Sequence, residues 1–188
     1  MPRGAQVIYP KDIGPIMMLA DVFPGARVFE SGLGSGAIST ALLRAGAEIV
    51  GYELREDFAV RARKNVAAVL GDAALERYHV ELRDAYEGVD AIDVDRAILD
   101  LPEPWQVIPH LTPVLRPGGV LVAYTPSIIQ ATRVRETLGR GPFARASTVE
   151  VFLRGLHFDG PAVRPYHRMV AHTGFLIYAR RIEDGAGE

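Results

Sequence analysis

The stretch Phe29-Glu30-Ser31-Gly32-Leu33-Gly34-Ser35-Gly36 decides the fold of this chain. It follows a short strand-like run that begins at Arg27, and it precedes a helical pattern from Ala37 to Arg44. Glycines let the backbone turn tightly and approach a ligand closely. The start of a helix adds unpaired N–H groups and the positive end of a dipole. A strand–loop–helix unit of this composition is typical of a nucleotide-like cofactor site.

The glycine spacing distinguishes between cofactors. A dinucleotide loop has the pattern Gly-x-Gly-x-x-Gly, whereas this chain has Gly32-x-Gly34-x-Gly36 with Glu30 ahead of it. A leading carboxylate suits a cationic amino acid tail and would repel a phosphate. The pattern is therefore typical of an S-adenosylmethionine (SAM) loop. A NAD-dependent oxidoreductase, or a tight turn without any ligand, stays open as an alternative at this point.

Strand and helix patterns alternate along the 188 residues, which predicts a mostly parallel sheet with helices on both faces. We expect one α/β domain over residues 1–188, with a Rossmann-like sheet of seven strands. The last two strands have no helical pattern between them, so we expect them to pair as an antiparallel edge. The predicted helices cover residues 13–22, 36–44, 56–70, 105–115 and 128–138, and the predicted strands cover residues 27–29, 48–53, 78–82, 96–100, 119–125, 148–153 and 175–180.

Acidic residues stand at or just after the ends of the first four predicted strands. In an open α/β sheet this edge holds the ligand, and clustered carboxylates need partners. An ammonium group, a ribose diol and an adenine amine would supply such partners. We expect Glu53 to accept from the ribose hydroxyls and Asp84 from the adenine amine, with a capping role as the alternative for Asp84. The four acids are Glu30, Glu53, Asp84 and Asp100.

Asp100 lies in the segment Leu99-Asp100-Leu101-Pro102-Glu103-Pro104-Trp105, which the prolines hold extended after the fourth strand. SAM enzymes that methylate nitrogen place a short Asp/Asn-x-Pro segment here. Methylation of a neutral ring nitrogen creates a cation, so a fixed carboxylate stabilises the transition state. Asp100 is therefore the candidate catalytic residue. The alternative is a helix-capping aspartate, and Trp105 is interpreted as a packing anchor.

Composition narrows the class of protein. The absence of cysteine excludes disulfides, thiolate zinc sites and a cysteine nucleophile, and we expect no metal. No apolar run reaches membrane-spanning length, and the start Met1-Pro2-Arg3-Gly4 lacks a signal-peptide pattern. We therefore expect a cytoplasmic protein without membrane contact. The net charge is −2, but arginines outnumber acids over residues 133–168, a segment that suits either nucleic acid or solvent.

Five segments together carry a resemblance to a known family. In their order and spacing they resemble the tRNA adenine-58 N1-methyltransferase family, and the similarity runs from Gln6 to Arg180. The pair formed by the first and fourth segments is its most specific part. The segments are Gln6-Val7-Ile8-Tyr9-Pro10-Lys11-Asp12, the glycine loop, Tyr52-Glu53, Leu99-Asp100-Leu101-Pro102-Glu103-Pro104-Trp105 and His172-Thr173-Gly174-Phe175-Leu176.

This resemblance implies a class I SAM-dependent methyltransferase, usually a homotetramer, that methylates an adenine flipped out of a tRNA loop. It implies that Asp100 and Tyr9 are catalytic, with Tyr9 beside the target base. His172 is a candidate substrate contact, with a buried structural role as its alternative. The implied cofactor contacts are Ile8, Glu30, Gly32, Gly34, Ser35, Gly36, Glu53, Asp84 and Asp100.

Two departures from the family pattern affect the expected substrate. Family members have a small β-rich domain before the Ile-Tyr-Pro motif that helps to hold tRNA, and the residues ahead of Ile8 leave no room for one. The loop at residues 45–47 is also short. The alternatives are therefore a SAM-dependent methyltransferase that acts on another RNA or on a small molecule, and a non-catalytic SAM-binding subunit of a methyltransferase complex.

Overall fold

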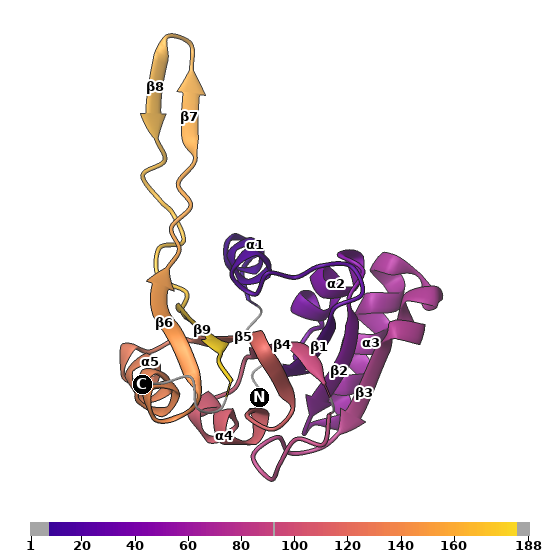
Figure 1. The fold of residues 1–188 in the computed structure, drawn as a ribbon. Helices are drawn as coiled ribbons and strands as arrows, with labels where there is room; N and C mark the ends of the chain where they lie inside the picture. Colours follow the sequence, from indigo (N-terminus) through magenta and orange to yellow (C-terminus); the bar gives the residue numbers. More distant parts are fainter. Residues whose placement is uncertain (1–7, 92, 184–188) are drawn as a thin grey trace.

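A seven-stranded sheet forms the centre of the computed structural model, which describes residues 8–91 and 93–183 (Figure 1). The strand order is β3-β2-β1-β4-β5-β9-β6, and β1 to β5 are parallel. β9 runs antiparallel to both β5 and β6. The strands are β1 (Arg27–Ser31), β2 (Glu48–Glu53), β3 (Tyr78–Leu82), β4 (Val94–Leu99), β5 (Leu115–Thr125), β6 (Phe143–Glu150) and β9 (Phe175–Arg181).

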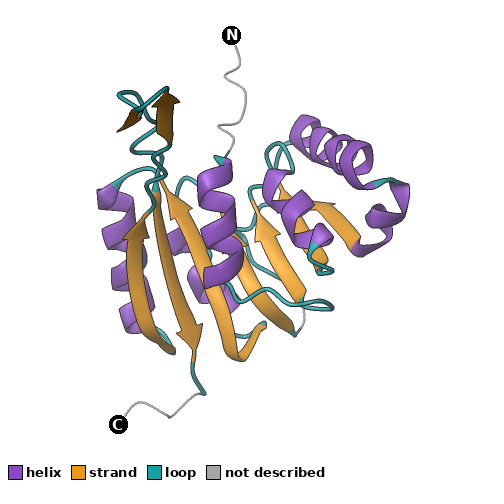
Figure 2. Cartoon of the chain, turned by 90° about the horizontal axis from the view of Figure 1, so that it is seen from above, coloured by secondary structure: helices purple, strands orange, loops and turns teal. Residues whose placement is uncertain are grey.

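Helices cover both faces of this sheet (Figure 2). Side chains of successive strand residues alternate between the faces. On β1, Val28 packs with α1, α2 and α3, whereas Phe29 packs with α4 and α5 on the opposite face. The helices are α1 (Pro10–Leu19), α2 (Ala37–Arg44), α3 (Glu56–Leu70), α4 (Ile108–Leu111) and α5 (Ile128–Arg140), with 3₁₀ turns at Asp72–Arg77 and Pro104–Gln106.

The predicted fold class is confirmed. The seven predicted strands form the sheet, and β6 pairs with β9 in antiparallel fashion as expected. The reversal of strand order between β1 and β4 creates the crevice in which open α/β sheets bind their ligands. None of the helices within the described ranges has both the length and the apolar character needed to cross a lipid bilayer.

Several predicted elements differ from the structure in their extent. The strand predicted over residues 148–153 is β6, which runs from Phe143 to Glu150. Instead of one helix over residues 105–115 there is the 3₁₀ turn and the short α4, because Pro113 has no N–H to donate to the preceding turn and its ring disfavours continuation of the helix. The predicted turn Pro117-Gly118-Gly119 lies within β5, where the pairing with β4 shifts register. Helix α1 begins at Pro10, three residues before the predicted start. Gln6 and Val7 of the first motif lie outside the described residues.

A β-hairpin was not predicted at all. Strands β7 (Leu156–Asp159) and β8 (Ala162–Pro165) pair with each other and not with the central sheet. The resulting ribbon projects away from the sheet beyond β6 and β9 (Figure 1). Every residue of β8 is exposed, so the burial pattern that reveals strands of a sheet is missing here.

Candidate active site

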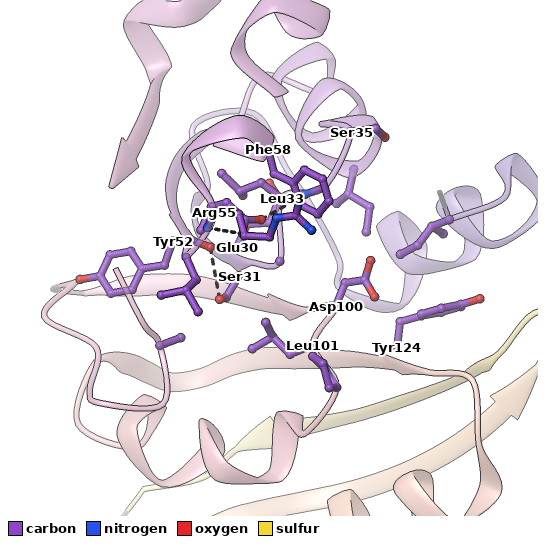
Figure 3. Close-up of a pocket in the computed structure, with 18 of the residues that line it drawn as sticks. Glu30, Ser31, Leu33, Ser35, Tyr52, Arg55, Phe58, Asp100, Leu101 and Tyr124 are labelled. Carbon is purple, nitrogen blue, oxygen red and sulfur yellow. Dashed lines mark hydrogen bonds between the residues drawn. The ribbon is translucent and has the colours of Figure 1, made fainter. Parts of the chain in front are cut away.

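A cavity of about 550 Å³ opens where the strands β1, β2, β4 and β5 end (Figure 3). The loop after β3 also contributes to its wall. This cavity therefore lies at the edge of the sheet that the strand-end acids predicted. Of the predicted site residues, those that line it are Ile8, Glu30, Gly32, Gly34, Ser35, Glu53, Asp84 and Asp100.

The glycine loop has a left-handed backbone at each of its glycines, with φ angles of 87° at Gly32, 51° at Gly34 and 77° at Gly36. A Cβ at Gly32 would lie 2.0 Å from the carbonyl oxygen of Asp100. A Cβ at Gly36 would lie 3.0 Å from the backbone of Ala62 on α3. Gly32 therefore lets the Asp100 segment approach the loop, whereas Gly36 lets α2 and α3 pack closely.

Glu53 and Asp84 are both held by backbone N–H groups. One Glu53 oxygen accepts from Gly34 N at 3.3 Å and the other from Arg55 N at 3.0 Å. Asp84 Oδ1 accepts from Tyr86 N at 2.9 Å, which is the local turn that the capping alternative anticipated, although no helix begins there. Both side chains line the cavity, so their turn-forming and ligand-binding roles are compatible.

Glu30 and Asp100 carry strongly perturbed carboxyl groups. Burial raises the pKa of Glu30 to about 8, and the nearby Asp100 adds to the shift, while Ser39 offsets part of it. Burial raises the pKa of Asp100 to about 7, with a further contribution from Glu53. Such shifts arise where charged groups are crowded and desolvated, as in binding sites. A cationic ligand would stabilise both ionised forms.

Backbone and side-chain hydrogen bonds hold the Asp100 segment in place. Asp100 N donates to Ser31 O at 2.9 Å, which continues the β1–β4 pairing. Two residues on, Pro102 O accepts from the Gln130 side chain on α5 at 2.8 Å. Glu103 N donates to the Tyr86 hydroxyl at 3.1 Å. Contacts from β1, α5 and the loop after β3 therefore fix the backbone of the segment that carries the Asp100 carboxylate, which we interpret as catalytic.

Three predicted site residues lie outside the cavity lining. Gly36 is at the start of α2 against α3, and Tyr9 precedes α1 with its side chain partly exposed. His172 is exposed and contacts Glu150 at 2.5 Å and Pro126 O at 2.8 Å. The alternative that His172 is a buried residue is therefore wrong, because its side chain is exposed. Trp105 packs against the core, as predicted.

Sequence reasoning missed part of the lining. Tyr124 lies at the end of β5, where its ring comes close to Asp100 (Figure 3). The rule that singled out the strand-end acids would have found Tyr124 had it been applied to aromatic residues. Phe58 and Arg55 come from the start of α3, where the Arg55 guanidinium stacks 3.8 Å from the centre of the Phe58 ring.

The residues present fit SAM. Glu30 Oε2 is buried and makes no hydrogen bond to the described residues, so an ammonium group would supply the missing partner. When bound, SAM supplies an electrophilic methyl group on a sulfonium. The acids at the ends of the strands suit both its cationic groups and its hydroxyls, and they disfavour a pyrophosphate.

Fold and cavity together define a class I SAM-dependent methyltransferase. The strand order, the glycine turn between β1 and α2 and the acids at the strand ends are all in place. Residues 1–160 match the family described as tRNA methyltransferase complex GCD14 subunit. The chain belongs to this family, and the predicted resemblance is confirmed.

Curated relatives support the same assignment. The tRNA (adenine(58)-N(1))-methyltransferase TrmI of Thermus thermophilus is 35% identical over 96% of this chain and 71% of its own length. The tRNA (adenine(57)-N(1)/adenine(58)-N(1))-methyltransferase TrmI of Methanocaldococcus jannaschii is 32% identical over 96% of this chain and 73% of its own.

Solved structures show the same fold. A SAM-dependent O-methyltransferase from Thermotoga maritima superposes with a TM-score of 0.89 at 35% identity, over 95% of this chain and 67% of that one. The tRNA (m1A58) methyltransferase TrmI from Aquifex aeolicus superposes with a TM-score of 0.83 at 26% identity, over 98% of this chain and 73% of that one.

Proposed function

We propose that this chain transfers the methyl group of SAM to N1 of an adenine in tRNA, at the position 58 for which its relatives are named. The observation that carries the proposal is the Asp100 carboxylate at the wall of the cavity, on a segment whose backbone is held by contacts from β1, α5 and the loop after β3. It lies on the β4 side of the glycine loop, so it can accept from the adenine amine while the ring nitrogen attacks the methyl group.

The other site assignments belong to the same proposal. Glu30 faces the ammonium group, Glu53 the ribose and Asp84 the adenine of the cofactor, with Ile8 and the loop from Gly32 to Ser35 as walls. Gly36 shapes the loop from outside the cavity. Tyr9 and His172 are proposed substrate contacts, because Tyr9 follows Ile8 of the cavity wall and His172 contacts Pro126, which also lines the cavity. The chain would act as one methyltransferase domain over residues 1–188, in the cytoplasm.

We also propose a homo-oligomer, with a tetramer as the expected form. The β7–β8 ribbon supports it, because directly paired residues of a hairpin share a face. Pairing of Phe158 with Val163 and of Leu156 with Pro165 gathers these four on one face, and His157 and Arg164 pair on the other.

The apolar face of the ribbon is uncovered. Leu156, Phe158 and Val163 are exposed by 51%, 69% and 55%. A lone two-stranded ribbon is marginally stable in water, and exposed apolar patches are typical of interaction surfaces. A second copy would cover this face and bring the arginines of several subunits around one RNA. Exposed arginines for that role include Arg135 and Arg140 on α5.

The test is mass spectrometry of nucleosides from unmodified tRNA after incubation with the protein and SAM. We expect N1-methyladenosine, and its loss when the tRNA carries a guanine at position 58. Because the Thermotoga maritima neighbour is described as an O-methyltransferase, the same digest is searched for ribose-methylated nucleosides. SAM binding without any methylated nucleoside would contradict an RNA substrate and favour a small molecule or a non-catalytic subunit.

A further inference from the structure

Two of the motifs that carry the family resemblance meet in a buried polar network that the proposed chemistry does not use. Lys11 and Asp12 begin α1, and both side chains are almost completely shielded from solvent. The Lys11 ammonium donates to Asp12 Oδ1 at 2.8 Å, to Val151 O at 2.7 Å and to the Thr173 hydroxyl at 2.6 Å. Since an ammonium has three N–H donors, every donor of Lys11 is engaged.

Thr173 connects this ion pair to the cavity. Its hydroxyl accepts from Lys11 and donates to Asp12 Oδ2 at 2.6 Å. Its carbonyl oxygen accepts from the Tyr124 hydroxyl, also at 2.6 Å. Side chain and main chain of Thr173 are thus both committed, one to the ion pair and the other to the tyrosine.

Gly174 completes the support of Tyr124. A Cβ at Gly174 would lie 2.5 Å from Cζ of the Tyr124 ring and 2.6 Å from Cε2. No real Cβ makes such contacts with a ring, so any side chain at position 174 would displace the Tyr124 ring. The adjacent residues Thr173 and Gly174 therefore determine both where the ring lies and where its hydroxyl points.

Tyr124 lies on the side of the cavity away from the residues assigned to the ribose and the adenine of the cofactor. The residues assigned to the ribose and the adenine, Glu53 and Asp84, come from the β2 and β3 side, whereas Asp100 and Tyr124 come from β4 and β5. The sheet order places these two groups on opposite sides of β1. The aromatic ring beside Asp100 is thus a wall of the acceptor end (Figure 3).

We infer that Lys11, Asp12 and Thr173 are positioning residues that hold the Tyr124 ring beside Asp100, where it orients the methyl-accepting base. The inference rests on the proposed function for the identity of the base. The hydroxyl of Tyr124 is occupied by Thr173 O, so the ring contributes a surface for packing and not a hydrogen bond to the substrate. Burial also raises the pKa of Tyr124 to about 12, which keeps the donor protonated at neutral pH.

A buried ion pair by itself is weak evidence for a stabilising role, because desolvation offsets its attraction. A fully hydrogen-bonded network does, however, restrict the groups attached to it to one arrangement. That restriction suits an aromatic wall, because misplacing a reacting group by about 1 Å can lower a rate about a hundredfold.

The first experiment compares Thr173→Val with Thr173→Ser. Valine keeps the shape but removes both hydroxyl contacts, whereas serine keeps the hydroxyl. We expect Thr173→Val to lower kcat/KM for tRNA at least tenfold and to weaken tRNA binding in the presence of S-adenosylhomocysteine. SAM affinity from calorimetry should change less than twofold, and Thr173→Ser should recover most of the activity. Equal losses of SAM affinity and activity would make Thr173 merely structural and overturn the inference.

A double-mutant cycle with Tyr124→Phe identifies the route of the effect. If Thr173 acts through the Tyr124 hydroxyl, Thr173→Val should lower kcat/KM for tRNA much less in the Tyr124→Phe background than in the wild type. Full additivity of the two losses would overturn the inference. If Thr173→Val does not fold, Tyr124→Phe alone decides, since an unchanged kcat/KM would show that the hydroxyl anchor is irrelevant.

A readout without catalysis separates this inference from the proposed function. In protein with ¹³C-labelled tyrosine, the Tyr124 ring signal is assigned as the one missing from Tyr124→Phe. We expect it to shift or broaden in Thr173→Val and to stay in place in Lys64→Glu, an exposed change on α3. A shifted signal in a protein inactive on tRNA would refute the proposed function and support the positioning role. An unmoved signal in an active protein would refute the positioning role alone.

Discussion

Individual carboxyl groups determine the chemistry of this site, because its walls hold the four acids Glu30, Glu53, Asp84 and Asp100. Glu30 and Asp100 are crowded and desolvated, and each therefore binds its proton more tightly than it would in water. A cofactor with two cationic groups reverses that preference. Ionisation of Glu30 and Asp100 is thus unfavourable in the ligand-free site and favourable when a cationic cofactor is bound.

Asp100→Asn keeps the size of the side chain and removes its charge. We expect methyl transfer to fall at least tenfold, because a preorganised electrostatic contact is typically worth ~2.7–4 kcal/mol in the transition state. The affinity for SAM should change little. Initial rates and calorimetry measure the two effects. Unchanged turnover would return Asp100 to a structural role, and an equal loss of SAM binding would make it a cofactor ligand first.

The pH dependence of methyl transfer by the wild type and by Asp100→Asn provides a second check of this prediction. The ionised carboxylate is the form that stabilises a cation, and the pKa of Asp100 is about 7 in the ligand-free protein. The wild-type rate at low SAM concentration should therefore rise as pH increases towards 7 and level off above it. The Asp100→Asn variant should lack the part of this rise that Asp100 causes.

Glu30→Gln tests whether the buried acid is held at a cost in stability. The pKa of Glu30 is raised from 4.5 to about 8 in the folded state, so the folded protein binds this proton more tightly than the unfolded chain. Its contribution therefore favours folding below pH 4.5, and stability is lost as pH rises from there to about 8. Glutamine removes this loss but also removes the partner of the ammonium group.

We expect Glu30→Gln to raise the free energy of unfolding without ligand at pH 8.5, on the order of a few kcal/mol since one pKa unit is ~1.4 kcal/mol. The gain should shrink at pH 5, and SAM affinity should fall. Thermal unfolding at both pH values measures the effect. The same stability difference at pH 5 and pH 8.5 would show that Glu30 is not desolvated as described.

At the scale of elements, the strand β1, its glycine loop and helix α2 work as one unit with the end of β4. Gly32 and Gly36 each make room for a neighbouring element, and between them Leu33, Gly34 and Ser35 face the cavity. The loop geometry is thus set by packing on both sides before any ligand arrives. Preorganisation of this kind lowers the entropy lost on binding.

Gly32→Ala and Gly25→Ala form a matched pair. Their φ angles are 87° and 83°, but a Cβ would meet the Asp100 carbonyl at Gly32 and nothing within 4 Å at Gly25. Gly25→Ala should cost about 1–2 kcal/mol of unfolding free energy from its left-handed backbone alone. Gly32→Ala should cost clearly more and abolish SAM binding. Equal costs in denaturant unfolding would show that the approach of Asp100 does not require glycine.

At the scale of the whole molecule, the central sheet buries its core, and the β7–β8 ribbon extends away from it (Figure 1). The chain from Val151 to Gly174 contributes few buried side chains of its own. Its root, however, joins the network of Lys11, Asp12 and Thr173. The part of the chain proposed to contact another subunit is therefore attached next to the acceptor end of the site.

Phe158→Glu tests the proposed assembly. Placing a charge on the apolar face of the ribbon should lower the molar mass in solution to that of a smaller species, while SAM affinity stays within about twofold. His157→Glu, on the opposite face of the same strand, is the matched control and should leave the mass unchanged. Light scattering after size-exclusion chromatography measures both. A wild type that is monomeric, or variants with the same mass, would contradict the proposed use of this face.

The alternation of apolar runs and the glycine loop were sufficient to predict the fold, because both reflect local rules. Strand and helix periodicity, the turn-forming glycines and the acid after each strand are encoded within a few residues of one another. They led to the seven-stranded sheet and to a cavity wall that includes Glu30, Glu53, Asp84 and Asp100. The same local rules failed at Pro113, where a proline cut the predicted helix short.

The features that only the tertiary structure decided are contacts between residues far apart in the sequence. Nothing local to Thr173 indicates that it joins Lys11, 162 positions away, and supports Tyr124. Nothing local to Gly32 indicates that it faces the carbonyl of Asp100. The β7–β8 ribbon could not be predicted from the sequence either. A periodic apolar pattern arises where one face of a strand is buried, and the ribbon buries neither face within this chain. Local patterns thus determined the elements, whereas long-range packing and hydrogen bonding determined how the acceptor end of the site is held.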